Sequence, residues 1–327
     1  MEKEEVFVYL ARLNGHVRRV TSISTNNDPT IMISSSDDKC IIVWRIINDS
    51  NSYAVPQRCL TGHTHIVSDV VLSSNSKHAI SASWDGDLRH WDIATGISTH
   101  RFVGHTNRAM SVALFNDSVI ASGGHDKSVK VWNVLGTCKW NSDSHSDWLS
   151  CVRFVPGTAS PRLVTGAWDG SVKVWDLDMN NRGALVERFA TSGHYGFVKM
   201  VAVSPDGSLM ASGGTDGLVK LWDLEQGVML HEIDVGSLVH SLSFCPSEYS
   251  LSIATEKVVI VWSLTLKKNV EEFSFHNTYC SSLNWSGNGR TLFCANNDDA
   301  ENSRTNEGQG HESADRVRPK NEIQKDL

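Results

Sequence analysis

The feature that most constrains the fold is a tryptophan that recurs along the chain. It stands at six positions that are 40 to 47 residues apart: Trp44, Trp91, Trp132, Trp175, Trp222 and Trp262. A small hydroxyl residue stands ten residues before each one, at Ser34, Ser81, Ser122, Thr165, Ser212 and Ser252. A carboxylate stands six residues before each one, at Asp38, Asp85, Asp126, Asp169, Asp216 and Glu256. Repeats of this length are typical of four-stranded propeller blades rather than of helical repeats.

A histidine completes the pattern in five of the repeats, at His16, His63, His105, His145 and His194. The four residue types predict a buried hydrogen-bond chain from indole to hydroxyl to imidazole to carboxylate. Such a chain gives every buried polar atom a partner, and an atom without one costs about 1 to 3 kcal/mol. His, Ser and Asp also make up a catalytic triad. A nucleophile is needed once, however, and this set occurs five times, so we interpret it as structural.

Composition favours a globular protein of a reducing compartment. A net charge of −7 excludes a protein that coats nucleic acid with its whole surface, but not one with a local basic face. The seven cysteines include no Cys-x-x-Cys pair, which indicates free thiols. The charged start, Met1 to Glu5, is unlike a signal peptide, and the apolar run 258–262 is too short to span a bilayer. We therefore expect a cytoplasmic protein without membrane insertion.

Between the marker residues the chain reads as strand and turn. The runs 129–132 and 172–175 alternate between apolar and polar residues, and Asp-Gly or Asn-Gly pairs at 85, 169, 206, 216 and 288 indicate hairpins. Propellers grow by adding blades around one axis, so we expect one all-β domain, a seven-bladed WD-repeat β-propeller over residues 1–298. Residues 6–10 precede the first blade, and we expect them to form the outer strand of the last blade.

The seventh blade is expected to be incomplete. Residues 291–298 match the beginning of a blade, with Asp298 as its turn carboxylate, but polar residues 299–304 follow where an apolar strand is needed. Residues 299–327 contain no aromatic residue, and 12 of these 29 residues are charged, which predicts a disordered C-terminal tail. Residues 316–318 are a candidate substitute strand, against which Pro319 argues.

Five longer runs carry a resemblance to a known family. They are YAVPQRCLTG (53–62), SASWDGDLRHW (81–91), RFVGHT (101–106), SHSDWLSCVRF (144–154) and SPDGSLMASGGTDG (204–217). With these runs, residues 6 to 298 resemble the receptor for activated C kinase family. The resemblance implies a WD-repeat scaffold that is not an enzyme and has no cofactor. It also implies binding to the RNA and proteins of the small ribosomal subunit, and docking of signalling kinases such as protein kinase C.

The same resemblance implies a basic turn in the first blade that contacts ribosomal RNA. The family has Arg-Asp-Lys at this turn, and this chain has Asp37-Asp38-Lys39, so one charge is reversed. A carboxylate that faces a phosphate is repelled by about 1 kcal/mol or more. RNA binding adds many small phosphate contacts, so we predict that six bases on neighbouring blades contact RNA: Arg18, Arg19, Lys39, Arg58, Lys127 and Lys130. Arg18, Arg19 and Arg58 are expected to share one rim. Lys127 is expected in the equivalent turn of the third blade, with Lys130 on the strand after it.

Four aromatic residues outside the repeat register are candidate partner contacts. Trp84, Trp148 and Trp168 are large enough to anchor an interface if they are exposed, and packing between blades is their alternative role. Tyr249 stands where the resemblance implies a regulatory tyrosine, and an ordinary strand tyrosine is its alternative.

Enzyme motifs are missing from the sequence. It contains no phosphate-binding P-loop, no His-Glu-x-x-His and no Gly-x-Ser-x-Gly, and His65 near His63 has no third metal ligand close in sequence. What the family resemblance implies is therefore our expectation: an adaptor bound to the small ribosomal subunit that links signalling kinases to translation. The alternative is a free cytosolic signalling scaffold that no longer binds ribosomes, and a propeller enzyme is a remote third class. The sequence leaves the oligomeric state open.

Overall fold

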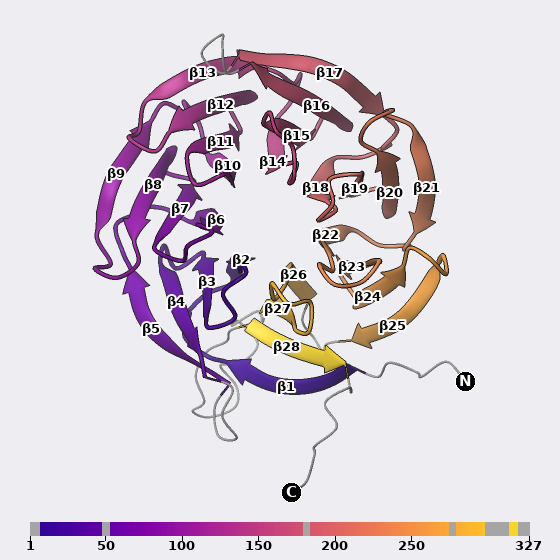
Figure 1. Cartoon of the computed structure of the whole chain (residues 1–327), viewed down its shortest axis with the longest axis horizontal. Helices are drawn as coiled ribbons and strands as arrows, with labels where there is room; N and C mark the ends of the chain where they lie inside the picture. Colours follow the sequence, from indigo (N-terminus) through magenta and orange to yellow (C-terminus); the bar gives the residue numbers. More distant parts are fainter. Residues whose placement is uncertain (1–6, 48–52, 179–183, 275–278, 298–313, 320–327) are drawn as a thin grey trace, which may run out of the picture.

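The computed structural model describes residues 7–47, 53–178, 184–274, 279–297 and 314–319. Every regular element in these ranges is a β-strand, and the strands form seven four-stranded sheets. The sheets stand as blades around a central axis (Figure 1), so the predicted propeller fold is confirmed.

The first blade contains, from the axis outward, β2 (Val20–Ser24), β3 (Ile31–Ser36), β4 (Ile41–Ile46) and β5 (Ala54–Leu60). The next five blades repeat this order: β6 (Val67–Leu72), β7 (His78–Ser83), β8 (Asp87–Asp92) and β9 (Ser98–Val103); β10 (Ala109–Phe115), β11 (Val119–Gly124), β12 (Ser128–Asn133) and β13 (Cys138–Asp143); β14 (Leu149–Phe154), β15 (Arg162–Ala167), β16 (Ser171–Asp178) and β17 (Ala184–Ser192); β18 (Val198–Val203), β19 (Leu209–Gly214), β20 (Leu218–Asp223) and β21 (Met229–Asp234); β22 (Val239–Phe244), β23 (Ser250–Thr255), β24 (Val258–Ser263) and β25 (Lys268–Ser274).

Each blade has two ends, because neighbouring strands are antiparallel. The connection that enters the innermost strand and the turn between the second and third strands lie at the same end. A hydrogen bond of 3.0 Å from Asp37 N to Arg19 O joins them in the first blade. We call this end the histidine rim, because the five repeat histidines lie on it, and we call the other end the opposite rim.

The seventh blade joins the two ends of the chain. It contains β26 (Tyr279–Trp285), β27 (Leu292–Asn297) and β28 (Ala314–Pro319), and β1 (Phe7–Leu13) is its outermost strand (Figure 1). β28 pairs with β27 at four positions, whereas the same pairing has five positions in each of the other blades. The seventh blade is therefore less complete than the others.

β28 lies in the segment 299–327, for which the sequence predicted a disordered tail. The structure corrects that prediction for residues 314–319. β28 pairs with both β27 and β1, and so satisfies backbone groups that these two strands would otherwise leave open. Pro319 lies at the end of the strand, where a proline is tolerated. Asp298 and the rest of the expected tail, 299–313 and 320–327, lie outside the described residues.

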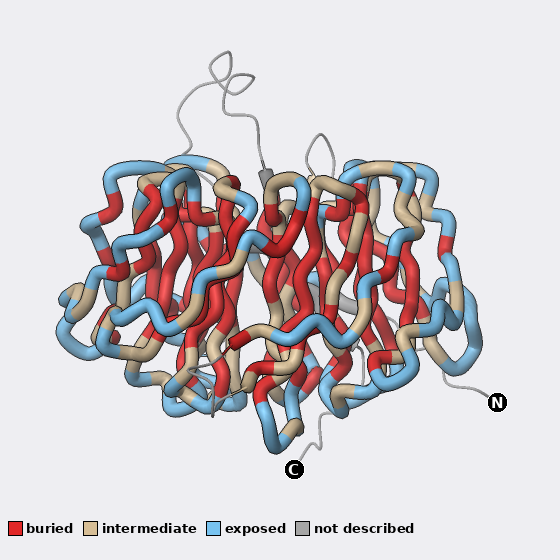
Figure 2. The backbone as a smooth tube through the Cα atoms, turned by 90° about the horizontal axis from the view of Figure 1, so that it is seen from above, coloured by how far each residue is buried: buried red, intermediate tan, exposed pale blue. Residues whose placement is uncertain are grey.

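The hydrophobic core is divided among the interfaces between blades. Each of seven buried clusters combines side chains from two neighbouring blades. At the closing interface, Phe293 and Ala295 of β27 pack against Val20 and Trp44 of the first blade. Figure 2 shows that buried residues run along the strands, between two exposed rims.

The repeated residues form a hydrogen-bond chain inside each of the first five blades. In the first blade, Trp44 Nε1 donates to Ser34 Oγ at 2.8 Å, and His16 Nε2 lies 2.8 Å from the same oxygen. His16 Nδ1 lies 2.9 Å from Asp38 Oδ2. In the next four blades the distance from the indole nitrogen to the hydroxyl is 2.9 Å. The hydroxyl lies 2.7 to 2.8 Å from the histidine Nε2, and the histidine Nδ1 lies 2.8 to 3.1 Å from the carboxylate. The geometry suits a neutral imidazole that donates from Nδ1 to the carboxylate.

The sixth blade departs from this pattern. Its hydroxyl, Ser252, accepts a 3.1 Å hydrogen bond from Trp285 Nε1 of the seventh blade rather than from Trp262. Trp262 stacks on His231 of β21 in the fifth blade, with ring centres 5.2 Å apart. The same hydroxyl position therefore links two blades here, whereas it stabilises a single blade in the first five repeats.

The turn carboxylates make the stability of the fold dependent on pH. Burial raises the pKa of Asp126, but the hydrogen bonds that its carboxylate accepts from His105, Ser128 and the backbone of Thr106 outweigh burial, and the pKa lies well below its usual range. A carboxylate with a lowered pKa stabilises the fold above its unfolded pKa of about 4, and this contribution is lost as the pH falls toward the folded pKa.

We expect Asp126→Asn to reduce the free energy of unfolding at pH 7 by about 1 to 3 kcal/mol, because it weakens the bond to His105. The difference from the wild type should shrink as the pH falls from 4 to 2. Urea unfolding across this pH range measures both effects. Asp143→Asn, at an exposed position on β13, is the control. A difference that is constant with pH would contradict this account.

We also expect amide hydrogens of β27 to exchange at least about tenfold faster than those of β11, because β28 covers fewer positions of its blade. Hydrogen exchange with mass spectrometry compares peptides that cover 279–297 with peptides that cover 109–133. Equal protection of the two regions would show that the seventh blade is as stable as the third.

Candidate functional site

Two exposed bases lie on the histidine rim of the first blade. Arg18 lies in the connection before β2, and Lys39 lies in the turn between β3 and β4. The turn is held by a bond from Ser36 Oγ to Arg18 O, at 3.2 Å, and by a bond from Cys40 N to Asp38 Oδ1, at 2.9 Å. Lys39 has a φ of 72°, the left-handed region that such a tight turn requires. The hydrogen-bond chain therefore fixes the backbone that carries both cations.

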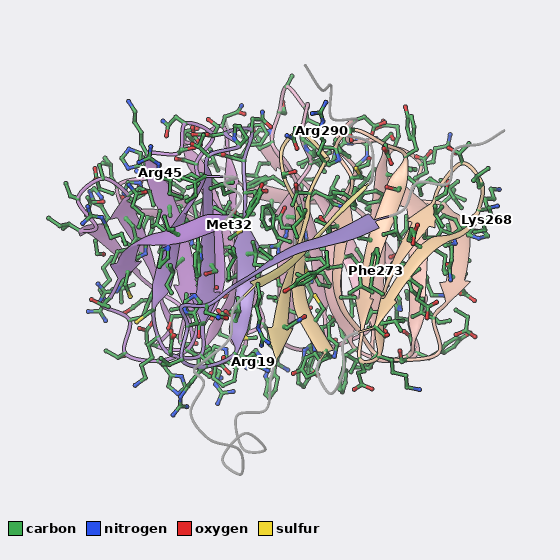
Figure 3. All side chains as sticks on the ribbon, turned by 90° about the horizontal axis from the view of Figure 1, so that it is seen from below. Arg19, Met32, Arg45, Lys268, Phe273 and Arg290 are labelled. Atoms are coloured by element: carbon green, nitrogen blue, oxygen red, sulfur yellow. The ribbon has the colours of Figure 1, made fainter. Side chains whose placement is uncertain are left out.

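The reversed charge at Asp37 is compensated inside the site. Its carboxylate pairs with Arg19, with 3.0 Å between Nε and Oδ2 and 3.3 Å between Nη2 and Oδ1. Burial opposes the charge of Arg19, but Tyr279 and Asp37 favour it, so the pKa of the guanidinium is raised. Asp37 thus neutralises one cation of the rim rather than standing alone. Figure 3 places Arg19 at one end of the molecule, away from Arg45 and Arg290.

Lys127 occupies the equivalent turn of the third blade and is also held in place. Its φ is 64°, and its ammonium donates to the carbonyl of Ser146 at 2.7 Å. Asp147 Oδ1 lies 3.9 Å from the same ammonium. Lys127 lies on the histidine rim as expected, but it ties the third blade to the fourth.

Two of the six predicted bases lie away from the histidine rim, and for Arg58 this corrects the prediction. Arg58 lies on the outer strand β5 and donates to the carbonyl of Thr95 at 3.2 Å, in the turn after β8 at the opposite rim. Lys130 is only 6% exposed, because it lies on β12 with its ammonium 2.7 Å from Asn141 Oδ1 of β13. Alternation along a strand turns these side chains toward neighbouring protein, so the candidate RNA contacts are Arg18, Arg19, Lys39 and Lys127.

The predicted aromatic contacts lie in two groups on the histidine rim. Trp148 and Trp168 belong to a row that crosses three blades, with successive ring centres 4.2, 4.8 and 4.6 Å apart from His125 through both tryptophans to Phe197. Trp84 lies apart, 5.5 Å from His65, with the Arg108 guanidinium 4.0 Å from its ring centre. All three tryptophans are half-buried, so they serve both as packing and as accessible surface.

Tyr249 lies at the opposite rim, where it is 74% exposed. It belongs to the connection between β22 and β23, and its carbonyl accepts a hydrogen bond of 2.9 Å from Leu264 N. The structure therefore does not bring Tyr249 together with the tryptophans.

The central channel contains functional candidates that the sequence analysis missed. Each innermost strand has a bulge, and the seven bulged residues all line a channel cavity of about 370 Å³: Thr21, Ser68, Met110, Ser150, Lys199, His240 and Ser281. The sequence repeats could have revealed these residues. In the five blades with a repeat histidine, the bulged residue stands five positions after that histidine. It is Thr or Ser after His16, His63 and His145, but Met after His105 and Lys after His194.

The described part of the chain shows neither a metal-binding cluster nor a membrane-spanning helix. Within the described ranges, no group of three or more His, Cys, Asp or Glu side chains could hold a metal ion. The same ranges contain no helix with the length and apolar character needed to cross a membrane. All seven cysteines are free thiols.

Comparison with known proteins agrees with this geometry. The family model "WD domain, G-beta repeat" matches residues 7–45, 54–92, 96–133, 136–176 and 186–223, which is more than half of the chain. The protein is therefore a WD-repeat propeller.

Three similar proteins show to which family of WD-repeat proteins the chain belongs. The chain is 45% identical over 326 residues to the small ribosomal subunit protein RACK1y of Oryza sativa subsp. japonica, covering 91% of this chain and 95% of the relative. It is 43% identical to the cross-pathway control WD-repeat protein 2 of Flammulina velutipes, covering 87% and 93%. It is 42% identical to the MST50-interacting protein 11 of Pyricularia oryzae, covering 90% and 96%. The chain belongs to the RACK1 (receptor for activated C kinase) family, which confirms the resemblance seen in the sequence.

Proposed function

We propose that this protein is a non-enzymatic scaffold in the cytoplasm that binds the small ribosomal subunit and links signalling kinases to translation. The observation that carries the proposal is the rigid presentation of Arg18 and Lys39 on the histidine rim of the first blade. A relative named as a small ribosomal subunit protein is 45% identical to the chain, which supports the same reading.

Phosphate binding suits this rim. Both side chains are exposed, and the backbone beneath them is fixed, so binding has to order the two side chains but not the turn that carries them. Each phosphate contact is modest and is screened by salt, and several contacts add up to a stable complex. Arg19 stands beside them as a third cation, although Asp37 neutralises it.

The remaining surfaces fit a scaffold role. The tryptophan row on the histidine rim and Tyr249 on the opposite rim are separated, so two partners can bind without competing. We propose Trp84, Trp148 and Trp168 as contacts for protein partners, and exposed Tyr249 as a residue that a kinase can reach. Protein kinase C is the kinase that we propose, on the strength of the family resemblance.

A second candidate function is a free signalling scaffold that does not bind ribosomes. The pairing of Asp37 with Arg19 favours it, because this pairing leaves the first-blade rim with fewer available cations than an Arg-Asp-Lys turn would present. The two candidates differ in the affinity of this rim for RNA.

We expect Asp37→Asn to tighten binding to the small subunit by about tenfold, because it releases Arg19 for a phosphate contact. Co-sedimentation with eukaryotic small subunits that lack their own family member measures the affinity across a salt series. The slope of log affinity against log salt should steepen by about one for the added contact. Failure of the wild type to bind at low salt, with binding by Asp37→Asn, would favour the free scaffold. No binding by either variant would refute the first-blade site.

Lys39→Met and Lys130→Met separate an exposed lysine from a buried one. We expect the first to weaken co-sedimentation by about tenfold, since it removes a phosphate contact. The second should leave co-sedimentation unchanged, because Lys130 already bonds Asn141 inside the third blade. Thermal unfolding of both variants controls for folding. Equal losses of binding by the two variants would contradict the assignment of RNA contact to the exposed lysine of the rim.

A further inference from the structure

The bulged residues of the channel have a structural task in four blades. The hydroxyls of Thr21, Ser68, Ser150 and Ser281 each donate to a backbone carbonyl of the next blade, at 2.5 to 2.7 Å. A bulge re-aims a side chain, and here it directs a hydroxyl across a blade interface. This task requires a short side chain with an O–H group.

The fifth and sixth blades carry Lys199 and His240 at this position, and neither can make that hydroxyl bond. Lys199 Nζ instead donates to His240 Nδ1 at 2.8 Å, across the interface between the two blades. The His240 ring stacks on Tyr279 of the seventh blade, with ring centres 4.3 Å apart and planes at 18°. Two nitrogen-containing side chains that line the channel therefore occupy the bulge position that carries a structural hydroxyl in four other blades.

Lys199 is the available cation at this end of the channel. No ion pair between described residues includes it, and its side chain is exposed to the channel. Burial by the surrounding channel walls and the charge of Arg19 lower its pKa to about 8, and Glu256 opposes this shift. Burial and the two cations lower the pKa of His240 to about 3, so its imidazole is neutral and accepts the lysine hydrogen.

An aromatic wall stands next to this ammonium. Phe197, two residues before Lys199, stacks on Trp168 with ring centres 4.6 Å apart and planes at 14°. Both rings line the same cavity as Lys199, together with Leu238 and Met110. Phe197 is 43% exposed, and Tyr195 in the same connection is 93% exposed. The mouth of the channel thus combines one ammonium with an open apolar surface.

We propose that the histidine-rim mouth of the channel binds an acidic peptide segment of a partner protein. A carboxylate of the peptide accepts hydrogen bonds from Lys199, and an apolar side chain beside it packs against Phe197 and Trp168. A single ammonium matches the single charge of a carboxylate, and the aromatic wall supplies the anchor that peptide interfaces commonly use. The lining of this cavity includes neither Arg18 nor Lys39.

Single-stranded RNA is the competing ligand class, because bases also stack on aromatic rings. The charges near Lys199 disfavour it. Arg19 is paired with Asp37, and the negative charge of Glu256 acts on the lysine, so the described residues of the mouth do not form the row of free cations that a phosphate backbone needs. A peptide with one carboxylate requires no such row.

The proposal predicts a pH dependence with a definite sign. Lysine holds a carboxylate only when it is protonated, so affinity should fall as the pH rises past about 8 toward 10. Carboxylates of the peptide are ionised throughout this range. The other titratable groups around Lys199 are His240 on β22, Glu256 in the turn after β23, Arg19 with Asp37 and Tyr279, and deeper in the channel Asp69, Arg153 and Cys151. Arg153 and Asp69 are paired with each other at 3.1 Å.

The test uses the full chain and a library of fluorescent hexapeptides. Each peptide has one Glu beside one Phe, Leu or Trp and small neutral residues elsewhere, and a matched library has Gln in place of Glu. We expect fluorescence polarisation to detect binders in the Glu library whose affinity falls at least about tenfold with Gln. Lys199→Met should cause a similar loss, and Lys77→Met, an exposed lysine between β6 and β7, should cause none. Circular dichroism checks that Lys199→Met is folded.

Several outcomes would overturn the proposal. Absence of binders in the Glu library, equal binding of the Gln library, or full binding by folded Lys199→Met would each refute carboxylate capture by this lysine. If Lys199→Met does not fold, the pH series on the wild type decides, and an affinity that is constant from pH 7 to pH 10 would refute the role of the lysine. Binding of an eight-nucleotide oligouridylate at the same site, lost with Lys199→Met, would assign the mouth to RNA.

Discussion

The structure depends most on the hydrogen-bond chain that joins the core of a blade to its rim. In the first blade the chain begins at buried Trp44, passes through Ser34 and His16, and ends at Asp38 in a surface turn. Strand pairing alone would leave that turn and the nearby connection free to move. Because the chain ties them to an indole inside the blade, a rim built of loops becomes a rigid surface. This rigidity is what makes the exposed Lys39 useful for recognition.

The second requirement is contact between blades, since each sheet of the described residues is confined to one blade. Apolar clusters fill every interface, and polar side chains near the axis add directional bonds. The bulged hydroxyls of the inner strands are the most regular of these bonds. A residue that breaks this regularity has given up a structural bond. Lys199 and His240 break it on adjacent blades and contact each other, and this is why the channel mouth stands out as a site.

Not every basic residue in the sequence has a charge that is available to bind RNA. Arg19 is neutralised by Asp37, Arg58 bonds a carbonyl of the second blade, and Lys130 is buried against β13. A scaffold that binds RNA through the remaining cations has a small, local contact area. This agrees with a protein whose net charge of −7 excludes a nucleic-acid coat.

The repeat spacing by itself determined the class of fold. Marker residues 40 to 47 apart can be read directly from the sequence, and the strands and turns of each repeat follow from the local pattern of that repeat. The family could be predicted for the same reason, from runs of identical residues. Tertiary structure decided whatever depends on residues distant in sequence. Asp37 meets Arg19 across a blade end, Arg58 turns to a neighbouring blade, and β28 completes a sheet with β1 from the other end of the chain. Local patterns predict which face of a strand a residue occupies, but the partner that a charged side chain finds is fixed only when the ring closes.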